Sequence, residues 1–525
     1  MAKIKSSLVF KAHCPSQGFL LPPSLGDLIP SNHMVRLVAR VVDEMDISDL
    51  YNLYKGGGAS AFHPRMLLKV LLYAYSVKIY TGRRIARALH QDIHFMWLSG
   101  MSYPDFRTIN YFRSKRAKEV IETLFKGMLE ILMEEGYIKM ENYFCDGSTF
   151  VADANKYKMV WKKNSERYLA LAEQKCKELF KKIDKLNDLE EKEYGDKDLE
   201  ENGSDSEVTS ESVHAHVKKL NERVKTAVTK KARQQAGSLK SELSKAAGKV
   251  NKYKNQLSKA GKRSGYNATD NDASAMMMKN KVEILPAYNV IAGCEDQFIT
   301  GVSVHQNPND GTCLADHLEQ CAVQQPMTPV RIIADAGFGT EQNYELLEQL
   351  EVENYMKFNT FHAEEKKSYS SKIFLKQNFP YDTETDTYTC PNKQSLVFLK
   401  SYNSTHQRTG YKSFVKEYGC SSCDGCPFYQ QCCKSDAGAN RTIHINEKLE
   451  NYKQQARENL RSESGLKLRK QRSIEIESCF GDIKHNSGFR RFHLRGLKKV
   501  KTETILVAMA HNFKKMYLKG LEKAS

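Results

Sequence analysis

The sequence predicts an α/β protein: a mixed sheet with flanking helices, preceded by an all-α N-terminal domain and interrupted by a coiled-coil-like helical insertion and a cysteine-rich segment. Three observations lead to this prediction. Residues 28–137 carry a helical hydrophobic period, strand-like runs start at residue 142, and strand and helix patterns alternate before residue 361. At 525 residues the chain is long enough for roughly two to four structural units.

The N-terminal domain is predicted to span residues 1–140 and to bind DNA. In "HPRMLLKVLLYAYSV", Pro64 suits the first turn of a core helix with a wide apolar face. A short helix is expected to begin at a Thr81 cap and a long helix near Thr108. Clustered arginines on these helices suit DNA docking, although solvated helix faces have the same composition. The candidate contacts are Arg83, Arg84 and Arg113.

The sheet is predicted to be assembled from three stretches of chain, residues 141–164, 263–361 and 438–525. The first stretch begins with a strand or hairpin around residues 142–153. The second holds a hairpin in "KVEILPAYNVIAGCEDQFITGVSVHQ", a helix in "DGTCLADHLEQCAV", a strand in "VRIIADAGF", a helix in "TEQNYELLEQLE" and a strand in "ENYMKF". The third carries helical patterns in "RSIEIESCFGDIKHN" and "KKVKTETILVAMAHNFKKMYLKG".

Residues 165–262 interrupt the sheet with two heptad patterns, which predict an antiparallel helical hairpin. The apolar positions are Leu169, Ala172, Cys176, Leu179, Ile183 and Leu186, and then Leu239, Leu243, Ala246, Val250, Tyr253 and Leu257. Between them lies "NDLEEKEYGDKDLEENGSDSEVTSES", an acidic stretch that we expect to be solvated or disordered. The hairpin is interpreted as a spacer or protein-contact arm, and its lysine-rich second half is also suited to lie along DNA.

The charge balance favours a polyanionic partner. The formal net charge is +17 and the sequence pI is about 9.1, so the chain attracts nucleic acid over a long range, and plain basic solubility is the alternative. No apolar stretch is long enough to span a membrane, and the first residues lack the pattern of a secretory signal. The odd number of cysteines, 13, indicates a reducing compartment. We therefore expect a cytoplasmic protein.

Three acids stand out by their placement. Asp146 lies in the first predicted strand, Asp335 ends the strand "RIIAD" beside Gly337 and Gly339, and Glu477 lies on a C-terminal helix. Carboxylates that converge on Mg²⁺ or Mn²⁺ form the two-ion clamp that activates water or a 3′-hydroxyl for attack on a phosphodiester. Each acid taken alone also has an ordinary explanation, as a turn, capping or solvated residue.

The chain resembles the DDE transposases of bacterial insertion sequences, in the branch with an RNase H-like core and a Glu-x6-Lys third motif. "CDGSTFVADANKYKMVWKKN" resembles the block of the first acid, and "IIADAGFGTEQNYELLE" the block of the second. "IEIESCFGDIKHNSGFRRFHLRGLKKVKTE" resembles the third block, and "GYNATDNDASAMMMKN" the segment before the central strands. The N-terminal "HPRMLLKVLLYAYSVKIYTGRRIARALHQDIHFMWLSG" is similar to the helical domain that precedes this core.

The resemblance implies roles for individual residues. Asp146, Asp335 and Glu477 would be catalytic and would bind two Mg²⁺ or Mn²⁺ ions, with Glu475 as the competing third acid. Glu477 is preferred because Lys484 follows it at the spacing of the family. The family's tyrosine and arginine before the glutamate are replaced by Lys470 and Ser473, and Arg472 lies one position away. Residues expected to hold DNA phosphates near the acids are Lys484, Arg490, Arg491 and Arg495.

The implied activity is metal-dependent cleavage at the ends of an insertion sequence, followed by strand transfer into target DNA. The implied partners are double-stranded DNA, as terminal inverted repeats and target, and a second copy of the chain; the implied location is cytoplasmic and associated with the nucleoid. The alternatives are a nuclease or recombinase of the same fold that does not join strands, and a DNA-binding regulator without catalysis.

The turn-rich segment 362–437 contains the cysteine cluster "CSSCDGCPFYQQCC". Repeated C-x2-C spacing in a reducing compartment favours a structural zinc site of four thiolates. The candidate ligands are Cys420, Cys423, Cys426 and either Cys432 or Cys433, with Cys390 further upstream in "YTCPNK". The alternative is a cysteine-rich turn with free thiols.

Overall fold

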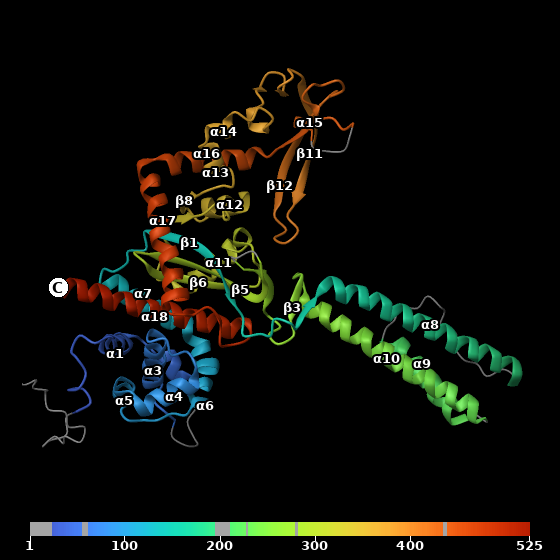
Figure 1. Cartoon of the computed structure of the whole chain (residues 1–525), viewed down its shortest axis with the longest axis horizontal. Coiled ribbons are helices and arrows are strands. Elements are labelled where there is room, and N and C mark those ends of the chain that lie inside the picture. The colour runs from blue at the N-terminus through green and yellow to red at the C-terminus, as the bar shows by residue number, and fades with distance from the viewer. Residues whose placement is uncertain are drawn as a thin grey trace, which may run out of the picture. The chain divides into compact units, whose positions relative to one another are not determined.

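The computed structural model describes residues 24–54, 61–194, 210–226, 229–278, 282–433 and 438–524 (Figure 1). The chain divides into two compact units. One consists of Met1–Ile131 with Met509–Ser525, and the other of Leu132–Ala508. The described part of the first unit is helical, as the sequence predicts, whereas the second combines helices with two large sheets, of which the sequence predicts only the mixed one.

The first unit is built from short helices whose starts follow the expected signals. Pro64 occupies the first turn of its helix, and the Thr81 hydroxyl accepts a hydrogen bond from the Arg84 backbone N–H at 3.4 Å. The long helix expected near Thr108 contains a π-helical turn. The elements are α1 (Met34–Glu44), α2 (Ser48–Asn52), α3 (Pro64–Ser76), α4 (Gly82–Gln91), α5 (Ile93–Ser99), α6 (Phe106–Tyr111), η1 (Phe112–Arg116) and α7 (Ala117–Glu134), which continues into the second unit.

A six-stranded mixed sheet, which we call the core sheet, forms the centre of the second unit. Its strands are β1 (Asn142–Val151), β4 (Ser274–Met277), β5 (Ile284–Glu295), β6 (Phe298–His305), β7 (Arg331–Ala334) and β8 (Glu353–Met356). Strand β5 pairs antiparallel with β1, β4 and β6, while β1, β7 and β8 run parallel to one another in that order. The predicted mixed sheet is confirmed, and every residue of β6 is buried.

Two features fix the central strands. The predicted hairpin between β5 and β6 turns at Asp296 and Gln297, whose φ values of 51° and 63° suit a tight two-residue turn. Just before that turn, the buried Glu295 carboxylate accepts four backbone N–H groups at 2.6–2.8 Å, those of residues 139–142. Glu295 therefore sets where β1 enters the sheet.

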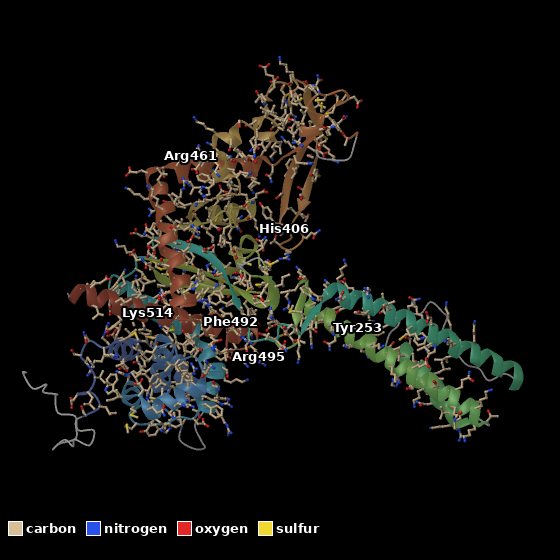
Figure 2. All side chains as sticks on the ribbon, viewed as in Figure 1. Tyr253, His406, Arg461, Phe492, Arg495 and Lys514 are labelled. Atoms are coloured by element: carbon tan, nitrogen blue, oxygen red, sulfur yellow. The ribbon has the colours of Figure 1, made fainter. Side chains whose placement is uncertain are left out.

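Helices cover the core sheet. The long helix α17 (Glu463–Gly481) packs across β1, β5, β7 and β8, and α11 (Leu314–Gln324) packs on β6. The other helices of this layer are α12 (Glu341–Gln349) and α16 (Glu447–Arg461), and α18 (Leu497–Ala524) begins in this unit. The aromatic ring of Phe150 packs against those of Phe480 in α17, of Phe489 and of Phe492, which Figure 2 labels.

The insertion consists of three helices, which corrects the predicted two-helix hairpin. They are α8 (Lys162–Tyr194), α9 (Ser210–Thr226) and α10 (Lys230–Ala260), and they lie side by side (Figure 1). The heptad positions of α8 and α10 are buried against each other, and Leu220 of α9 joins them. The side chain of Leu186 and most of the acidic stretch lie outside the described residues. Short strands β2 (Met159–Trp161) and β3 (Gly265–Asn267) pair at the base.

The segment predicted to be turn-rich contains a second sheet, which we call the outer sheet. Its antiparallel strands are β9 (Tyr381–Asp382), β10 (Thr387–Thr389), β11 (Ser395–Thr405), β12 (Lys412–Cys420) and β13 (Thr442–Ile445). Strands β11 and β12 form a long hairpin (Figure 1). The short helices of this segment are α13 (Phe361–Glu364), α14 (Lys367–Ser370), η3 (Lys376–Asn378) and α15 (Tyr429–Cys432).

Among the helices that the structure describes, none combines the length and the apolar character needed to cross a bilayer.

Candidate active site

Two of the predicted acids lie next to each other on the core sheet. Strands β1 and β7 are parallel, and their register pairs Cys145 with Ala334. Asp146 is the next residue of β1, and Asp335 directly follows the end of β7. Neighbouring strands lie about 4.8 Å apart. Each carboxylate accepts a local backbone N–H at 2.8 Å, Asp146 from Gly147 and Asp335 from Gly337. The sheet therefore brings these two acids together at one end.

The environment of Asp146 disfavours its negative charge. Burial, together with the neighbouring carboxylates of Asp335 and Asp310, raises the pKa of the Asp146 carboxyl to about 6, against the opposing effect of Arg472. An acid held this way is stabilised by a bound cation. Asp335 and Asp310 therefore lie near enough to Asp146 to disfavour its charge.

Arg472 links the third acid to this pair. From α17, its Nη1 lies 3.7 Å from Asp146 Oδ2 and its Nη2 lies 3.3 Å from Glu477 Oε1. The Arg472 side chain is only 13% exposed, and Nη1 is buried without a hydrogen-bond partner. This nitrogen is a buried donor whose N–H groups make no hydrogen bond, and it lies beside the Asp146 carboxylate. The arginine that differs by one position from the family spacing thus lies in the acid cluster.

The two candidates for the third acid have different surroundings. Glu475 is buried and accepts hydrogen bonds from the Gln297 backbone N–H at 2.6 Å and from Gln471 Nε2 at 3.0 Å. It fastens α17 to the turn between β5 and β6. The Glu477 side chain is 55% exposed and reaches Arg472 on the side of Asp146. Of these two acids, Glu477 is the one that shares Arg472 with Asp146, and its role as the third metal ligand stays a prediction.

Asp310 is a member of the cluster that the sequence does not reveal. It begins the short 3-10 helix η2 (Asp310–Thr312) and accepts a hydrogen bond from Asn289 Nδ2 at 2.5 Å. A Cβ atom added to Gly147 would lie 2.2 Å from Asp310 Oδ1, so only glycine fits beside it. The stretch "NPNDGT" resembles an ordinary helix start, and the only signal of this contact is the glycine that follows Asp146.

Lys484 lies against the edge of the site. It belongs to the π-helical turn η4 (Asp482–Asn486), and its Nζ donates to Ser148 Oγ at 2.6 Å and to the Thr149 carbonyl at 2.7 Å. The ammonium group also lies 4.3 Å from the centre of the Phe150 ring. Lys484 is therefore engaged with β1 in this structure, and its predicted phosphate contact remains a prediction.

The basic residues after Lys484 surround one acid. Arg491 Nη2 and Arg495 Nε donate to Asp153 carboxylate oxygens, each at 2.9 Å, and both arginine side chains are more than half exposed (Figure 2). The Arg490 Nε donates to the Lys484 carbonyl at 3.0 Å. These exposed guanidinium groups lie within the same unit as the acids, which is compatible with the DNA contacts predicted for them.

The three arginines singled out in the first unit differ. Arg83 and Arg84 are exposed, and the Arg83 guanidinium lies 5.0 Å from the Phe106 ring centre. Arg113 is buried and donates to the Tyr75 hydroxyl at 2.9 Å and to the Tyr80 carbonyl at 2.7 Å. The prediction that Arg113 contacts DNA is therefore corrected: its charge is used inside the helical unit, beside the π-helical turn.

The donor set at the strand ends suits a hard divalent cation. Carboxylate oxygens are the ligands that Mg²⁺ and Mn²⁺ prefer, and the raised pKa of Asp146 and the unfilled Arg472 nitrogen fit residues that could hold a cation and a phosphate. Over the described ranges, no three His, Cys, Asp or Glu side chains already form a group that could hold a metal ion.

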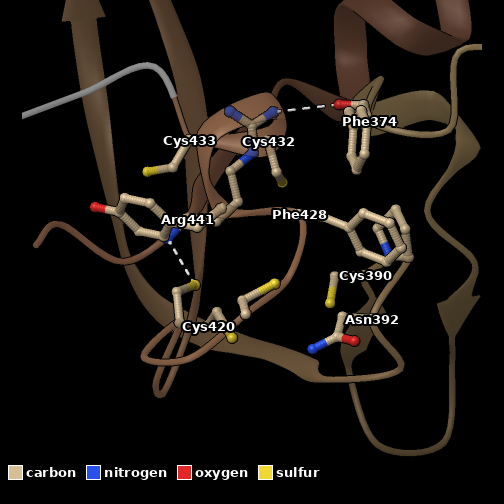
Figure 3. A pocket seen from close by; sticks show the side chains of 12 residues that line it. Phe374, Cys390, Asn392, Cys420, Phe428, Cys432, Cys433 and Arg441 are labelled. Carbon is tan, nitrogen blue, oxygen red and sulfur yellow. Dashed lines mark hydrogen bonds between the residues drawn. The ribbon is translucent and has the colours of Figure 1, made fainter. Parts of the chain in front are cut away.

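The predicted zinc ligands gather elsewhere, around a cavity of the outer sheet (Figure 3). Six cysteines line it: Cys390, Cys420, Cys423, Cys426, Cys432 and Cys433. The described cysteines are free thiols. Zinc binding at this cavity stays a prediction.

Comparison with known protein families finds two matches. Residues 389–517 match a family described as a transposase DDE domain, and residues 23–115 match a family described as a transposase domain of the DUF772 type. Both families are typical of bacterial insertion-sequence transposases. No curated protein and no solved structure matched the chain. A DDE domain has an RNase H-like fold, so the predicted fold class is confirmed.

Proposed function

Because a transposase DDE domain and a second transposase domain match parts of the chain, we propose that it cleaves DNA at the ends of a bacterial insertion sequence and joins the freed 3′ ends to target DNA. Transposases act on DNA, and DDE transposases use divalent metal ions. The proposal concerns the two chemical steps and the residues that carry them.

One observation carries the proposal: the parallel register of β1 and β7 aligns Asp146 with Asp335, and Arg472 connects them to Glu477. These acids are far apart in sequence, so their meeting at one sheet end is not a consequence of local structure. The raised pKa of Asp146 supports cation binding at this position.

Asp146, Asp335 and Glu477 would hold the cation. Asp310 lies close enough to raise the pKa of Asp146. A bound Mg²⁺ or Mn²⁺ would activate the attacking hydroxyl and neutralise charge on the phosphate. Arg472 would turn its unfilled Nη1 to a non-bridging phosphate oxygen, a charge-assisted contact that fixes the scissile group. Cleavage and joining are both in-line displacements at phosphorus, so one such site serves both steps.

DNA on either side of the scissile phosphate would be held by the basic residues near the site. Arg490, Arg491 and Arg495 are exposed, and an arginine fork matches a phosphate in two hydrogen bonds. Asp153 holds Arg491 and Arg495 in position until DNA replaces it. Arg83 and Arg84 of the helical unit would contact DNA further along, and two copies of the chain would bring two element ends together.

The test uses the full-length chain with Mg²⁺, end-labelled DNA that spans an element end, and a target plasmid. Labelled DNA joined to the plasmid is the expected product. Cleavage without joining would favour a nuclease, and binding without cleavage a regulator. Glu463→Gln is the matched control for Glu477→Gln, because Glu463 lies on the same helix with its side chain 86% exposed.

The role of Arg472 is tested in the same assay. Arg472→Met removes the donor but keeps most of the apolar stem, and we expect cleavage to fall by about 10²-fold. DNA binding should change little, since one phosphate contact among many is lost. Equal cleavage by Arg472→Met and the unmodified chain would contradict the assignment.

A further inference from the structure

The six cysteines around the cavity of the outer sheet fall into two groups by burial. Cys420 and Cys433 are buried, whereas the other four are half-buried. Cys420 also belongs to the small apolar core of the outer sheet, with Leu396, Tyr418 and Ile443. In Figure 3 the Cys433 side chain points away from Cys390 and Cys432. All six cysteines line the cavity, but Cys420 and Cys433 are the more deeply buried, and the other four are the more accessible.

Hydrogen-bond direction separates the cysteines in the same way. Cys420 Sγ donates to the Ser422 carbonyl at 3.2 Å, and Cys433 Sγ donates to the Ala439 carbonyl at 3.1 Å. A sulfur that donates must keep its proton. Cys390 Sγ instead accepts a hydrogen bond from the Gln394 backbone N–H at 3.4 Å. Figure 3 labels this cysteine.

Cys423 Sγ likewise accepts a backbone N–H, from Arg441 at 3.3 Å (Figure 3). A sulfur that accepts a backbone N–H is suited to be a thiolate, because the donor stabilises the negative charge. Such N–H bonds also orient metal ligands from outside the coordination sphere.

Two of the four half-buried cysteines lie at the start of similar tight turns. In the turn after β10, the Lys393 N–H donates to the Cys390 carbonyl at 2.8 Å, and Lys393 has a φ of 56°. In the second turn the Cys426 N–H donates to the Cys423 carbonyl at 3.3 Å, and Gly425 has a φ of 68°. The first turn brings the Cys390 sulfur to the Gln394 N–H, whereas the Cys423 sulfur meets the N–H of Arg441 from another segment. Cys426 ends the second turn, and Cys432 ends α15.

Arg441 supplies a cation to the same cavity. It lines the cavity, its Nη2 donates to the Phe374 carbonyl at 3.5 Å, and its Nε is buried without a hydrogen-bond partner (Figure 3). An unfilled buried N–H is costly, and a thiolate sulfur would fill it. Four thiolates with one Zn²⁺ carry a net charge of about −2, which a guanidinium partly offsets. The donor therefore points to a negatively charged group that belongs in this cavity.

We propose that Cys390, Cys423, Cys426 and Cys432 bind one structural zinc ion, while Cys420 and Cys433 remain thiols. This set replaces Cys420, which the sequence spacing favours, with Cys390 from the preceding turn. The four thiols release four protons as the ion binds, and their sulfurs turn inward, since no metal group is preformed in the described part of the chain. Four thiolates close the coordination sphere, so the ion ties the two turns and α15 together and does not catalyse.

The test follows metal binding by the chelator-treated, reduced full-length chain without DNA, so it does not depend on the proposed transposition chemistry. Cobalt(II) is the probe, because tetrahedral thiolate coordination gives intense visible absorption, and zinc should displace it at one equivalent per chain. Each of Cys390→Ser, Cys423→Ser, Cys426→Ser and Cys432→Ser should weaken binding by more than about 10²-fold, and Arg441→Met by about 10- to 100-fold.

Cys420→Ser and Cys433→Ser are the matched controls and should still bind one equivalent with the same spectrum. Proton release on zinc addition to the unmodified chain, up to four per ion, checks the site even where a variant fails to fold. The proposal is overturned if the unmodified chain shows no stoichiometric tetrahedral thiolate spectrum, or if Cys420→Ser abolishes that spectrum while Cys390→Ser retains it.

Discussion

The core sheet and the outer sheet belong to the same unit of the chain but differ in how far other elements cover them. Every residue of β6 in the core sheet is buried, whereas Leu396 is the only buried residue of β11 in the outer sheet. Helices α11 and α17 lie over the core sheet, while the outer sheet has a small apolar core and the cysteine cavity. A covered sheet can hold buried acids in register, and an open one needs another source of stability, for which we propose zinc.

The largest effect is expected at the acids of the core sheet. Asp335→Asn keeps the shape of the side chain but removes a charge, and we expect DNA cleavage to fall by roughly 10³-fold or more, with DNA binding kept. The outer sheet provides the control Glu417→Gln, on β12. Cleavage is measured with end-labelled DNA under saturating Mg²⁺. A comparable loss of cleavage in both variants would mean that Asp335 has no special role in the reaction.

Acid should destabilise the core sheet through His317. Its Nε2 contacts the Tyr143 hydroxyl at 2.8 Å and its Nδ1 contacts Ser303 Oγ at 2.6 Å, and burial lowers the pKa of His317 from 6.5 to about 3. The unfolded chain therefore binds the proton first, and stability is lost as the pH falls below 6.5. One such group contributes a loss of about 3 kcal/mol between pH 7 and pH 4.

Denaturant unfolding at both pH values measures this loss. In His317→Gln the difference between pH 7 and pH 4 should shrink by about 3 kcal/mol, although the variant is less stable at pH 7. His444→Gln, at an exposed position of the outer sheet, should leave the pH dependence unchanged. An unchanged pH dependence in His317→Gln would show that this histidine is not the acid-sensitive group.

A matched pair of glycines compares the packing of the two sheets. A Cβ atom at Gly293 in β5 would lie 1.8 Å from the Tyr143 ring, which is fully buried. At Gly419 in β12 it would meet the flexible end of Leu399 at 2.6 Å, and that side chain is 52% exposed. We expect Gly293→Ala to cost about 2 to 3 kcal/mol and Gly419→Ala under about 0.5 kcal/mol. Similar midpoints in thermal unfolding would refute the contrast.

The smallest effect is expected on the open face of the outer sheet. Leu399→Thr replaces an exposed apolar side chain with a good strand former, and we expect the free energy of unfolding to change by less than about 0.5 kcal/mol. Denaturant unfolding of the zinc-loaded chain is the measurement. A loss well above that range would mean that Leu399 is covered in solution, for instance by a second copy of the chain.

The same contrast explains what could be predicted from sequence. The strands and helices of the core sheet were predicted because burial imposes an apolar pattern, as in "RIIAD" and "YNVIAG". The outer sheet was missed, since its long strand β11 is exposed at every residue except Leu396 and carries no such pattern. Helix α9 was missed for a related reason. It adds only a few apolar side chains, such as Leu220, to a core that the heptad residues of α8 and α10 already form.

The candidate site was predicted in part. Asp146 and Asp335 could be identified because each belongs to a recognisable strand, and Lys484 helped to choose Glu477 over Glu475. Asp310 could not be found, because its contact with β1 depends on a missing side chain at Gly147. Nor could the contacts of Arg472, since they depend on how α17 is rotated over the sheet.

The base of the insertion has a consequence for the order of folding. Strand β1 leaves the ribosome long before β5, with all of α8, α9 and α10 between them. Lys162 Nζ donates to the Gly261 carbonyl at 3.0 Å, and β2 pairs with β3, so the two ends of the insertion meet. Once the three helices have folded from local contacts, β1 and β5 are joined by an effectively short loop. When the core sheet closes, the folded insertion therefore costs less loop-closure entropy than an unstructured segment of the same length would.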